Sequence, residues 1–93
     1  MSQSHLFDTY ARMPVHFVRG EGLWLYDAQG ERYLDALSGI AVCSLGHAHP
    51  RLAEALCDQA KTLWHTANIA HLPLQEELAT RLCAISGMDR AFL

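Results

Sequence analysis

The 93 residues carry 51% hydrophobic and 18% charged side chains with a formal net charge of −3, so this length allows one small domain or part of a larger one. The slight negative charge and the scattered lysine and arginine residues predict no nucleic-acid partner. No apolar run approaches the roughly 20 residues of a membrane span, and the start MSQSHLFDTY has no signal-sequence pattern, so a cytoplasmic protein without a membrane partner is expected.

Apolar side chains are unusually frequent for so short a chain. An average soluble domain carries about 25% charged residues, and this chain carries 18%. Because a small domain has a large surface for its volume, the excess predicts surface that is buried against something outside the chain. The odd number of cysteines, without a CxxC pair, disfavours a disulfide framework and predicts reduced, buried thiols at Cys43, Cys57 and Cys83.

The first third of the chain is predicted to hold a short helical turn followed by a β-hairpin. Apolar residues between positions 6 and 13 have the spacing of one docking helix face, which Pro14 would end. From residue 15 to residue 35 the apolar period changes to two, the period of a strand. Within it the segment DAQG, residues 27 to 30, has the composition of a tight turn, with Asp first and Gly last.

The seventeen residues 34 to 50, LDALSGIAVCSLGHAHP, are apolar and contain glycine, but they follow neither a helical nor a strand period. Such a segment suits the wall of a pocket, and it suits a buried loop equally well. Its ending has a plain structural explanation. Gly46 permits a turn, His47 or His49 can cap the N–H groups that open the next helix, and Pro50 suits the first helical position.

Two amphipathic helices are predicted in the second half, over residues 50 to 65 and 73 to 86. A linker at residues 66 to 72 would join them, and Gly87 would end the second helix in a left-handed conformation. The final residues Ala91-Phe92-Leu93 have the composition of the first half of a buried strand. Because no cap follows them, we expect this chain to be the beginning of a longer one.

The common catalytic and metal-binding patterns are weakly supported. The candidate metal ligands are Cys43, His47, His49, His65 and His71. Their irregular spacing predicts that no four of them come together to form a structural metal site. No serine lies in a GxSxG elbow, and the glycines form neither GxGxxG nor a P-loop. A stand-alone hydrolase or nucleotide-binding protein is therefore not expected.

Three segments together carry a resemblance to a known family: the hairpin GLWLYDAQGERYLD, the stretch SGIAVCSLGHAHP, and the helix ending in WHTAN. In this order they resemble the N-terminal part of the class III pyridoxal-phosphate aminotransferases, and the likeness covers residues 10 to 93. The GHAHP motif is shared across the class. The combination of GIAV, LGHAHP and WHT with Asn68 is similar to the subgroup that acts on acetylornithine.

The resemblance implies an α/β fold, the N-terminal portion of a fold-type I pyridoxal-phosphate transferase, with a β-hairpin of the small domain followed by two helices. It divides the chain into an N-terminal arm (residues 1–14), a small-domain hairpin and pocket-wall segment (15–49), and helices with a first strand that lead into the large domain (50–93). It also implies a homodimer, pyridoxal 5'-phosphate as coenzyme, and amino transfer between N-acetylornithine and 2-oxoglutarate in arginine biosynthesis.

The family's catalytic and cofactor-binding groups match no position in this chain. The only lysine, Lys61, falls on the polar face of its predicted helix, which is the wrong setting for a desolvated Schiff-base amine. The resemblance carries over a substrate-pocket wall instead, formed by Tyr10, Ile40, Ala41 and Val42. An aliphatic residue at position 40, where related ornithine aminotransferases have an aromatic one, would leave room for an acylated α-amine. The chain alone is expected to be inactive.

Other functions remain open on the sequence. A small, non-catalytic αβ binding or dimerisation module is one alternative. Within the class, succinyldiaminopimelate, succinylornithine, ornithine and 4-aminobutyrate aminotransferases are the near rivals. The residues that separate the first two from acetylornithine enzymes have no counterpart here.

Overall fold

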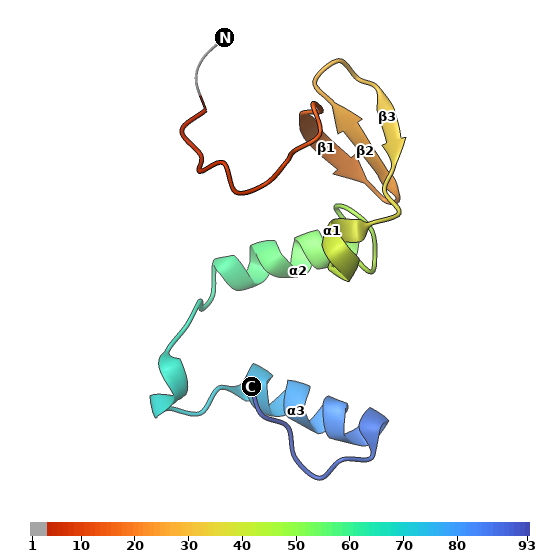
Figure 1. Cartoon of the computed structure of the whole chain (residues 1–93). Helices are drawn as coiled ribbons and strands as arrows, with labels where there is room; N and C mark the ends of the chain where they lie inside the picture. Colours follow the sequence, from red (N-terminus) through yellow and green to blue (C-terminus); the bar gives the residue numbers. More distant parts are fainter. Residues whose placement is uncertain (1–3) are drawn as a thin grey trace. The chain divides into compact units, whose positions relative to one another are not determined.

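The computed structural model describes residues 4–93, which fall into two compact units, one ending at Asp58 and the other spanning Gln59–Leu93. Strands and a short turn come first, and longer helices follow (Figure 1). In chain order the elements are β1 (Phe17–Glu21), β2 (Trp24–Asp27), β3 (Arg32–Leu34), α1 (Ser38–Ala41), α2 (Pro50–Ala60), η1 (Ala67–Ile69) and α3 (Pro73–Ser86).

The strands form an antiparallel sheet in the order β1-β2-β3. The predicted hairpin is confirmed between β2 and β3, where Leu25 pairs with Tyr33. The preceding residues form a further strand, β1, in which a bulge shifts the register between Phe17 and Arg19. The period of two over residues 15 to 35 therefore corresponds to a three-stranded meander.

The turn between β2 and β3 is held by Asp27, the one buried residue of the described chain, with 8% of its surface exposed. Its Oδ1 accepts hydrogen bonds from the backbone N–H groups of Gln29 at 2.9 Å and Glu31 at 2.8 Å. Its Oδ2 accepts a hydrogen bond from the Tyr33 hydroxyl at 3.3 Å. Burial, together with this nearby carboxylate, raises the pKa of Tyr33. The turn chemistry read from DAQG is confirmed, and Gly30 takes the left-handed φ of 86° that it requires.

Cross-strand pairs of aromatic and cationic side chains cover the sheet. The Arg19 guanidinium lies 3.8 Å from the centroid of the Tyr26 ring, and Arg32 lies 4.0 Å from that of Trp24. Cation–π contacts of this kind contribute about 0.5–1 kcal/mol at exposed sites. No hydrophobic side chain among residues 4–93 is buried, so the sheet has no apolar core within the described chain and consists of its backbone ladders together with such surface pairs.

Helix α2 begins at Pro50 as predicted but ends at Ala60, five residues before the expected end. Directly after α2, the Gln59 carbonyl accepts hydrogen bonds from the N–H groups of both Thr62 and Leu63. The Gln59 side chain donates to the Leu63 carbonyl at 2.8 Å, and the Trp64 indole donates to the Ala60 carbonyl at 2.6 Å. These bonds satisfy carbonyl groups that a continuing helix would have used.

Helix α3 has the predicted bounds, Pro73–Ser86. Pro73 opens the first turn, where its missing N–H costs nothing, and Glu76 lies near the positive end of the helix dipole. Gly87 ends the helix with a φ of 74°, and its N–H donates to the Cys83 carbonyl at 3.0 Å. The left-handed terminator is confirmed.

Three expectations about the ends and the cysteines are wrong. Residues 6–13 form no helical turn. Residues 91–93 carry no strand, since a strand needs a hydrogen-bonded neighbour and the described sheet contains only β1 to β3. The cysteines are free but not buried, because the helix faces that carry Cys57 and Cys83 have no cover within the described chain.

Large apolar side chains instead remain exposed on both helices, including Leu52 and Leu56 on α2 and Leu74 and Ile85 on α3. The predicted excess of apolar surface is thus visible in the structure. None of the helices within residues 4–93 is long and apolar enough to cross a membrane.

Candidate functional site

Within the stretch predicted as a pocket wall, residues Ser38–Ala41 form a single left-handed helical turn, α1. Ser38, Gly39, Ile40 and Ala41 have φ values of 56°, 64°, 63° and 61°. The ψ angles of Gly39 and Ile40 are 34° and 62°, which places both residues in the left-handed helical region. Leu37 before the turn and Val42 after it return to right-handed values. This turn explains why the sequence showed neither a helical nor a strand period.

This conformation is unfavourable for the residues that adopt it. A left-handed helical conformation costs about 1–2 kcal/mol per residue other than glycine. Ser38, Ile40 and Ala41 together therefore cost on the order of 3–6 kcal/mol. Ile40 is the sharpest outlier because its β-branched side chain crowds the backbone at positive φ. Backbone strain of this kind persists only where surrounding contacts over-determine it, and it clusters at functional sites.

Backbone hydrogen bonds close the turn from within. The Ala41 N–H donates to the Leu37 carbonyl at 3.0 Å. The Ser38 carbonyl accepts from the N–H groups of Val42 at 2.8 Å and Cys43 at 2.9 Å. These bonds fix the path of the chain but leave the N–H groups at the start of the turn to find other partners.

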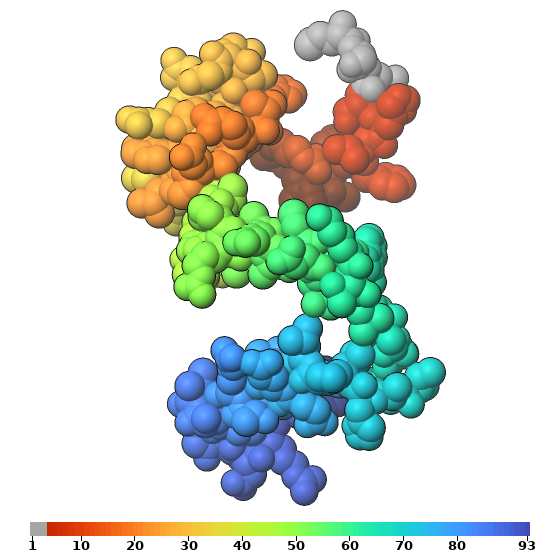
Figure 2. All heavy atoms as spheres, turned by 180° about the vertical axis from the view of Figure 1, so that it is seen from behind, coloured from red at the N-terminus to blue at the C-terminus, as the bar shows by residue number. Residues whose placement is uncertain are grey.

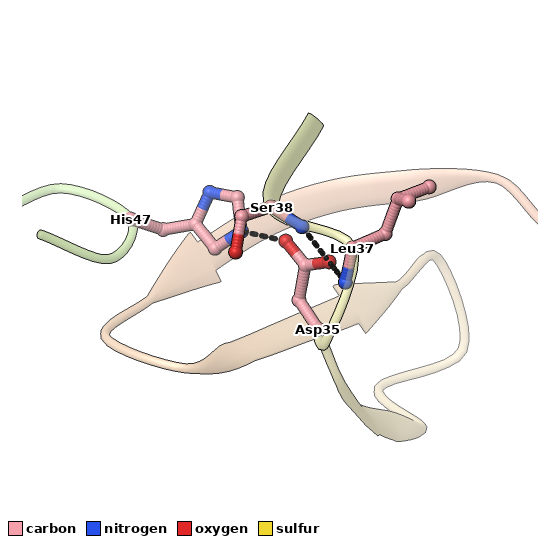
Figure 3. A network of polar contacts seen from close by, with 4 residues as sticks. All are labelled: Asp35, Leu37, Ser38 and His47. Carbon is pink, nitrogen blue, oxygen red and sulfur yellow. Dashed lines mark hydrogen bonds and ion pairs between the residues drawn. The ribbon is translucent and has the colours of Figure 1, made fainter. Parts of the chain in front are cut away.

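Asp35 supplies those partners (Figure 3). Its Oδ1 accepts hydrogen bonds from the N–H groups of Ser38 at 2.8 Å and Leu37 at 3.2 Å. Its Oδ2 lies 2.6 Å from Nε2 of His47. The Asp35 side chain is 10% exposed and the His47 side chain 21% exposed. The backbone bond from Ser38, followed by the His47 contact, lowers the pKa of Asp35, so its carboxylate is ionised at neutral pH.

His47 is in turn fixed against the sheet. The backbone groups of His47 and Gly22 exchange two hydrogen bonds, of 2.9 and 2.8 Å, in an isolated antiparallel bridge. A Cβ atom at Gly20 would lie 2.7 Å from His47 Cβ, and one at Gly46 would lie 2.8 Å from the Gly22 carbonyl oxygen. Glycine at both positions therefore allows the loop to lie directly on the bend between β1 and β2. Figure 2 shows this loop and the sheet in contact.

The predicted wall residues are all exposed, and the turn brings three of them together. Ile40 and Val42 are 80% and 75% exposed, and Ala41 between them is exposed as well. Tyr10 lies in the irregular segment before β1, where its ring contacts the Arg12 guanidinium 5.4 Å away. No hydrogen bond or ring contact joins Tyr10 to the turn within residues 4–93.

The other groups considered in the sequence are placed as follows. Lys61 lies in an exposed turn directly after α2 and not on a helix face. His49 caps α2, because its Nδ1 accepts a hydrogen bond from the Arg51 N–H at 3.2 Å. Among residues 4–93, no three His, Cys, Asp or Glu side chains gather closely enough to hold a metal ion.

Sequence reasoning missed Asp35 altogether and read His47 only as a possible helix cap. A signal for Asp35 was present, since an aspartate side chain commonly accepts hydrogen bonds from the backbone N–H groups two and three residues ahead of it and so caps a turn. The partnership with His47 had no such signal. It joins residues twelve positions apart and depends on the loop folding back onto the sheet.

Comparison with known proteins agrees with this architecture. The family model described as aminotransferase class-III matches residues 7–93. The chain is 62% identical over 89 residues to a Nitrosomonas europaea protein named acetylornithine aminotransferase, covering 96% of this chain and 23% of that protein. It is 54% identical over 87 residues to the Agrobacterium fabrum protein of the same name, covering 94% of this chain and 22% of that one.

Solved structures give the same result. An Elizabethkingia anophelis acetylornithine aminotransferase matches with a TM-score of 0.88 at 32% identity, over 92% of this chain and 22% of that one. A Toxoplasma gondii ornithine aminotransferase matches with a TM-score of 0.87 at 32% identity, over 92% of this chain and 20% of that one. The expected fold, the N-terminal portion of a fold-type I transferase, is confirmed by these likenesses.

The chain spans less than a quarter of the length of these relatives. Within that span the match runs almost from end to end and includes the sheet, the left-handed turn and both long helices. The chain therefore belongs to the class-III aminotransferase family.

Proposed function

We propose that this chain is the N-terminal portion of a pyridoxal-phosphate-dependent aminotransferase that exchanges an amino group between N-acetylornithine and 2-oxoglutarate in arginine biosynthesis. The observation that carries the proposal is the 62% identity, over 96% of the chain, to a relative named acetylornithine aminotransferase. Further relatives with 50–54% identity have the same name. The chain itself is proposed to be inactive without the rest of that enzyme.

The residues present do not fit as holders of the coenzyme. A Schiff-base lysine must be desolvated or placed beside another cation, whereas Lys61 is exposed. The sequence also contains no glycine-rich phosphate-binding motif. When bound elsewhere in the enzyme, the coenzyme supplies the electron sink for amino transfer. We infer that the groups that hold it lie outside this chain.

The contribution of this chain is a wall for the substrate pocket, formed by Tyr10, Ile40, Ala41 and Val42. Three observations support this role for the turn: its backbone is strained, it is anchored from outside, and it presents its apolar side chains to the exterior of the described chain. An aliphatic side chain at Ile40 occupies less depth than an aromatic ring. It would leave space for the acyl group that distinguishes N-acetylornithine from ornithine.

The wider organisation is proposed on the same grounds. Residues 1–14 would form an arm, residues 15–49 a part of the small domain, and residues 50–93 the entry into the large domain of a cytoplasmic homodimer. The exposed apolar faces of α2 and α3 would pack on the large domain and the second subunit, which accounts for their lack of cover here.

A stand-alone binding module is disfavoured because a domain that folds alone needs an apolar core, and none of the hydrophobic side chains in residues 4–93 is buried. Ornithine as the amino donor is the stronger rival. It is supported by the likeness to the Toxoplasma gondii ornithine aminotransferase.

The test is an amino-donor comparison on the whole enzyme that contains this segment, loaded with coenzyme. Specificity constants would be measured with 2-oxoglutarate for N-acetylornithine, N-succinylornithine, succinyldiaminopimelate, ornithine and 4-aminobutyrate. The proposal expects N-acetylornithine to have the highest value. A coenzyme-loaded enzyme that prefers ornithine or 4-aminobutyrate would overturn it.

A further inference from the structure

The left-handed turn is held by contacts that reach beyond its own backbone. Its three non-glycine residues carry an unfavourable conformation, and its internal hydrogen bonds would be equally available to a right-handed turn. A contact from outside the turn can therefore hold it in the left-handed form. Asp35 is placed to do so, since its Oδ1 accepts from both N–H groups at the entry of the turn.

Asp35 is itself oriented by His47. The carboxylate accepts two backbone N–H bonds and is ionised, so the proton between Oδ2 and Nε2 belongs to the imidazole. The 2.6 Å separation is that of a short, charge-assisted hydrogen bond. It fixes the rotation of the carboxyl group and hence the direction in which Oδ1 points.

His47 is fixed independently of Asp35. Its backbone is bridged to Gly22, and its ring fits only because Gly20 has no side chain. The path of restraint therefore runs from the sheet through the His47 imidazole to Asp35 and on to the first N–H groups of the turn (Figure 3). No part of this path uses the side chains of Ile40, Ala41 or Val42, which remain free to face a ligand.

We propose that Asp35 and His47 are positioning residues that hold the turn Ser38–Ala41 left-handed and thereby set where Ile40 stands in the amino-donor pocket. Neither residue is proposed to touch the substrate. The kinetic part of this inference rests on the proposed function, whereas its structural part does not. Loss of the pair would let the turn relax towards right-handed values and move the wall, while the reacting groups outside this chain stay in place.

The chain offers a matched pair of variants at His47. The amide nitrogen of glutamine reaches the position of imidazole Nε2 and can donate to Asp35, so His47→Gln should preserve the anchor. His47→Ala removes it. His71→Ala is the control, because the His71 side chain is 98% exposed and lies in the other unit.

The experiment compares these variants with Asp35→Ala and the double variant in the whole enzyme. Backbone hydrogen exchange of the peptide covering residues 36–43 reports on the turn without any substrate. His47→Ala and Asp35→Ala should each accelerate the exchange at least about fivefold, and the double variant should accelerate it no more than either single variant. In His47→Gln and His71→Ala the exchange rate should equal that of the wild type.

Kinetics separate positioning from mere stability. Partial unfolding lowers the active fraction and hence kcat, whereas a displaced wall raises the KM for the donor. We expect His47→Ala to raise that KM about tenfold with kcat changed less than about twofold, and His47→Gln to restore it.

Several results would overturn the inference: unchanged exchange in His47→Ala, additive effects in the double variant, or a His47→Gln enzyme that behaves like His47→Ala. Should His47→Ala fail to fold, His47→Gln still decides, because a folded His47→Gln enzyme with rapid exchange in the turn contradicts the anchor. Faster exchange combined with a preference for another amino donor would refute the proposed function and leave the anchor intact.

Discussion

The carboxylate of Asp35 and the imidazole of His47 lie 2.6 Å apart, between Oδ2 and Nε2, although twelve positions separate them in the chain. Through this pair the GHAHP loop is connected to the start of the left-handed turn. The motif thus has two separate roles in the structure. His49 caps α2, and His47 orients the carboxylate that holds the turn.

The lowered pKa of Asp35 predicts an acid limit to the order of the turn. A carboxyl whose folded pKa lies below its unfolded value, about 3.9, stabilises the turn fully above that value and loses this stabilisation as the pH falls through the folded pKa. Carbon-13 NMR of aspartate carboxyls in the whole enzyme, between about pH 6 and pH 3, should show Asp35 still ionised where typical aspartates are half protonated.

His47→Ala should raise the pH at which Asp35 is half protonated, because it removes the His47 hydrogen bond that lowers the pKa of Asp35. Arg19, Glu21 and His49 line the same groove as His47, so Arg19→Gln, Glu21→Gln and His49→Gln are the controls for their electrostatic effect on Asp35. An Asp35 midpoint at or above the usual aspartate range would contradict the hydrogen-bonding described for this carboxylate.

Gly20→Ala should displace the loop that carries His47. The added methyl would lie 2.7 Å from His47 Cβ and Cγ, closer than carbon atoms approach in folded proteins. Overpacking of this kind costs about 1–3 kcal/mol, and here it should raise the donor KM as well, because the anchor of the turn moves. Denaturant unfolding and steady-state kinetics measure the two effects.

Gly30→Ala is the matched control for that substitution. Its methyl meets no atom within 4 Å, so only the left-handed φ of 86° is penalised. It should lower stability by about 1–2 kcal/mol and leave the donor KM unchanged. Equal KM values for both alanine variants would show that Gly20 does not act through His47.

Asp27→Ala should destabilise the hairpin without affecting the turn. The substitution leaves the N–H groups of Gln29 and Glu31 without their acceptor, which costs about 1–3 kcal/mol. Tyr33→Phe should cost less, about 1 kcal/mol or below, since it removes a single hydrogen bond of 3.3 Å. Thermal unfolding of the whole enzyme gives both values, and a larger loss in Tyr33→Phe would reverse the assigned order.

The isolated chain of 93 residues should be molten and should not bind pyridoxal phosphate. No hydrophobic side chain of residues 4–93 is buried, so the free energy gained by burying apolar surface is too small to offset the conformational entropy lost on folding. Near-ultraviolet circular dichroism should be weak, a hydrophobic dye should bind, and equilibrium dialysis should detect no coenzyme binding. Cooperative unfolding of a coenzyme-binding monomer would contradict this expectation.

Elements governed by local chemistry could be predicted from the sequence. Pro73 and Gly87 bound α3 as expected, and DAQG forms the turn between β2 and β3. The end of α2 could not be predicted, because it depends on the side chains of Gln59 and Trp64 folding back onto carbonyl groups. A period of 3.6 in the apolar residues carries no information about such a stop.

The candidate site was predictable only in part. The irregular pattern pointed to the segment 34–50, and the resemblance pointed to Ile40, Ala41 and Val42 within it. A left-handed turn could not be predicted from residues of which only Gly39 favours it. We propose that Asp35 and His47 hold the turn from outside, and the contact between them is formed only in the tertiary structure.

The central claim is that the turn carrying Ile40 forms the wall that selects the amino donor. Its most direct test is the ratio of specificity constants for N-acetylornithine and ornithine in the whole enzyme with Ile40→Tyr. The tyrosine ring should fill the space left for the acyl group, so the ratio should fall at least about tenfold towards ornithine with the coenzyme still bound. A coenzyme-loaded Ile40→Tyr enzyme with an unchanged ratio would contradict the account.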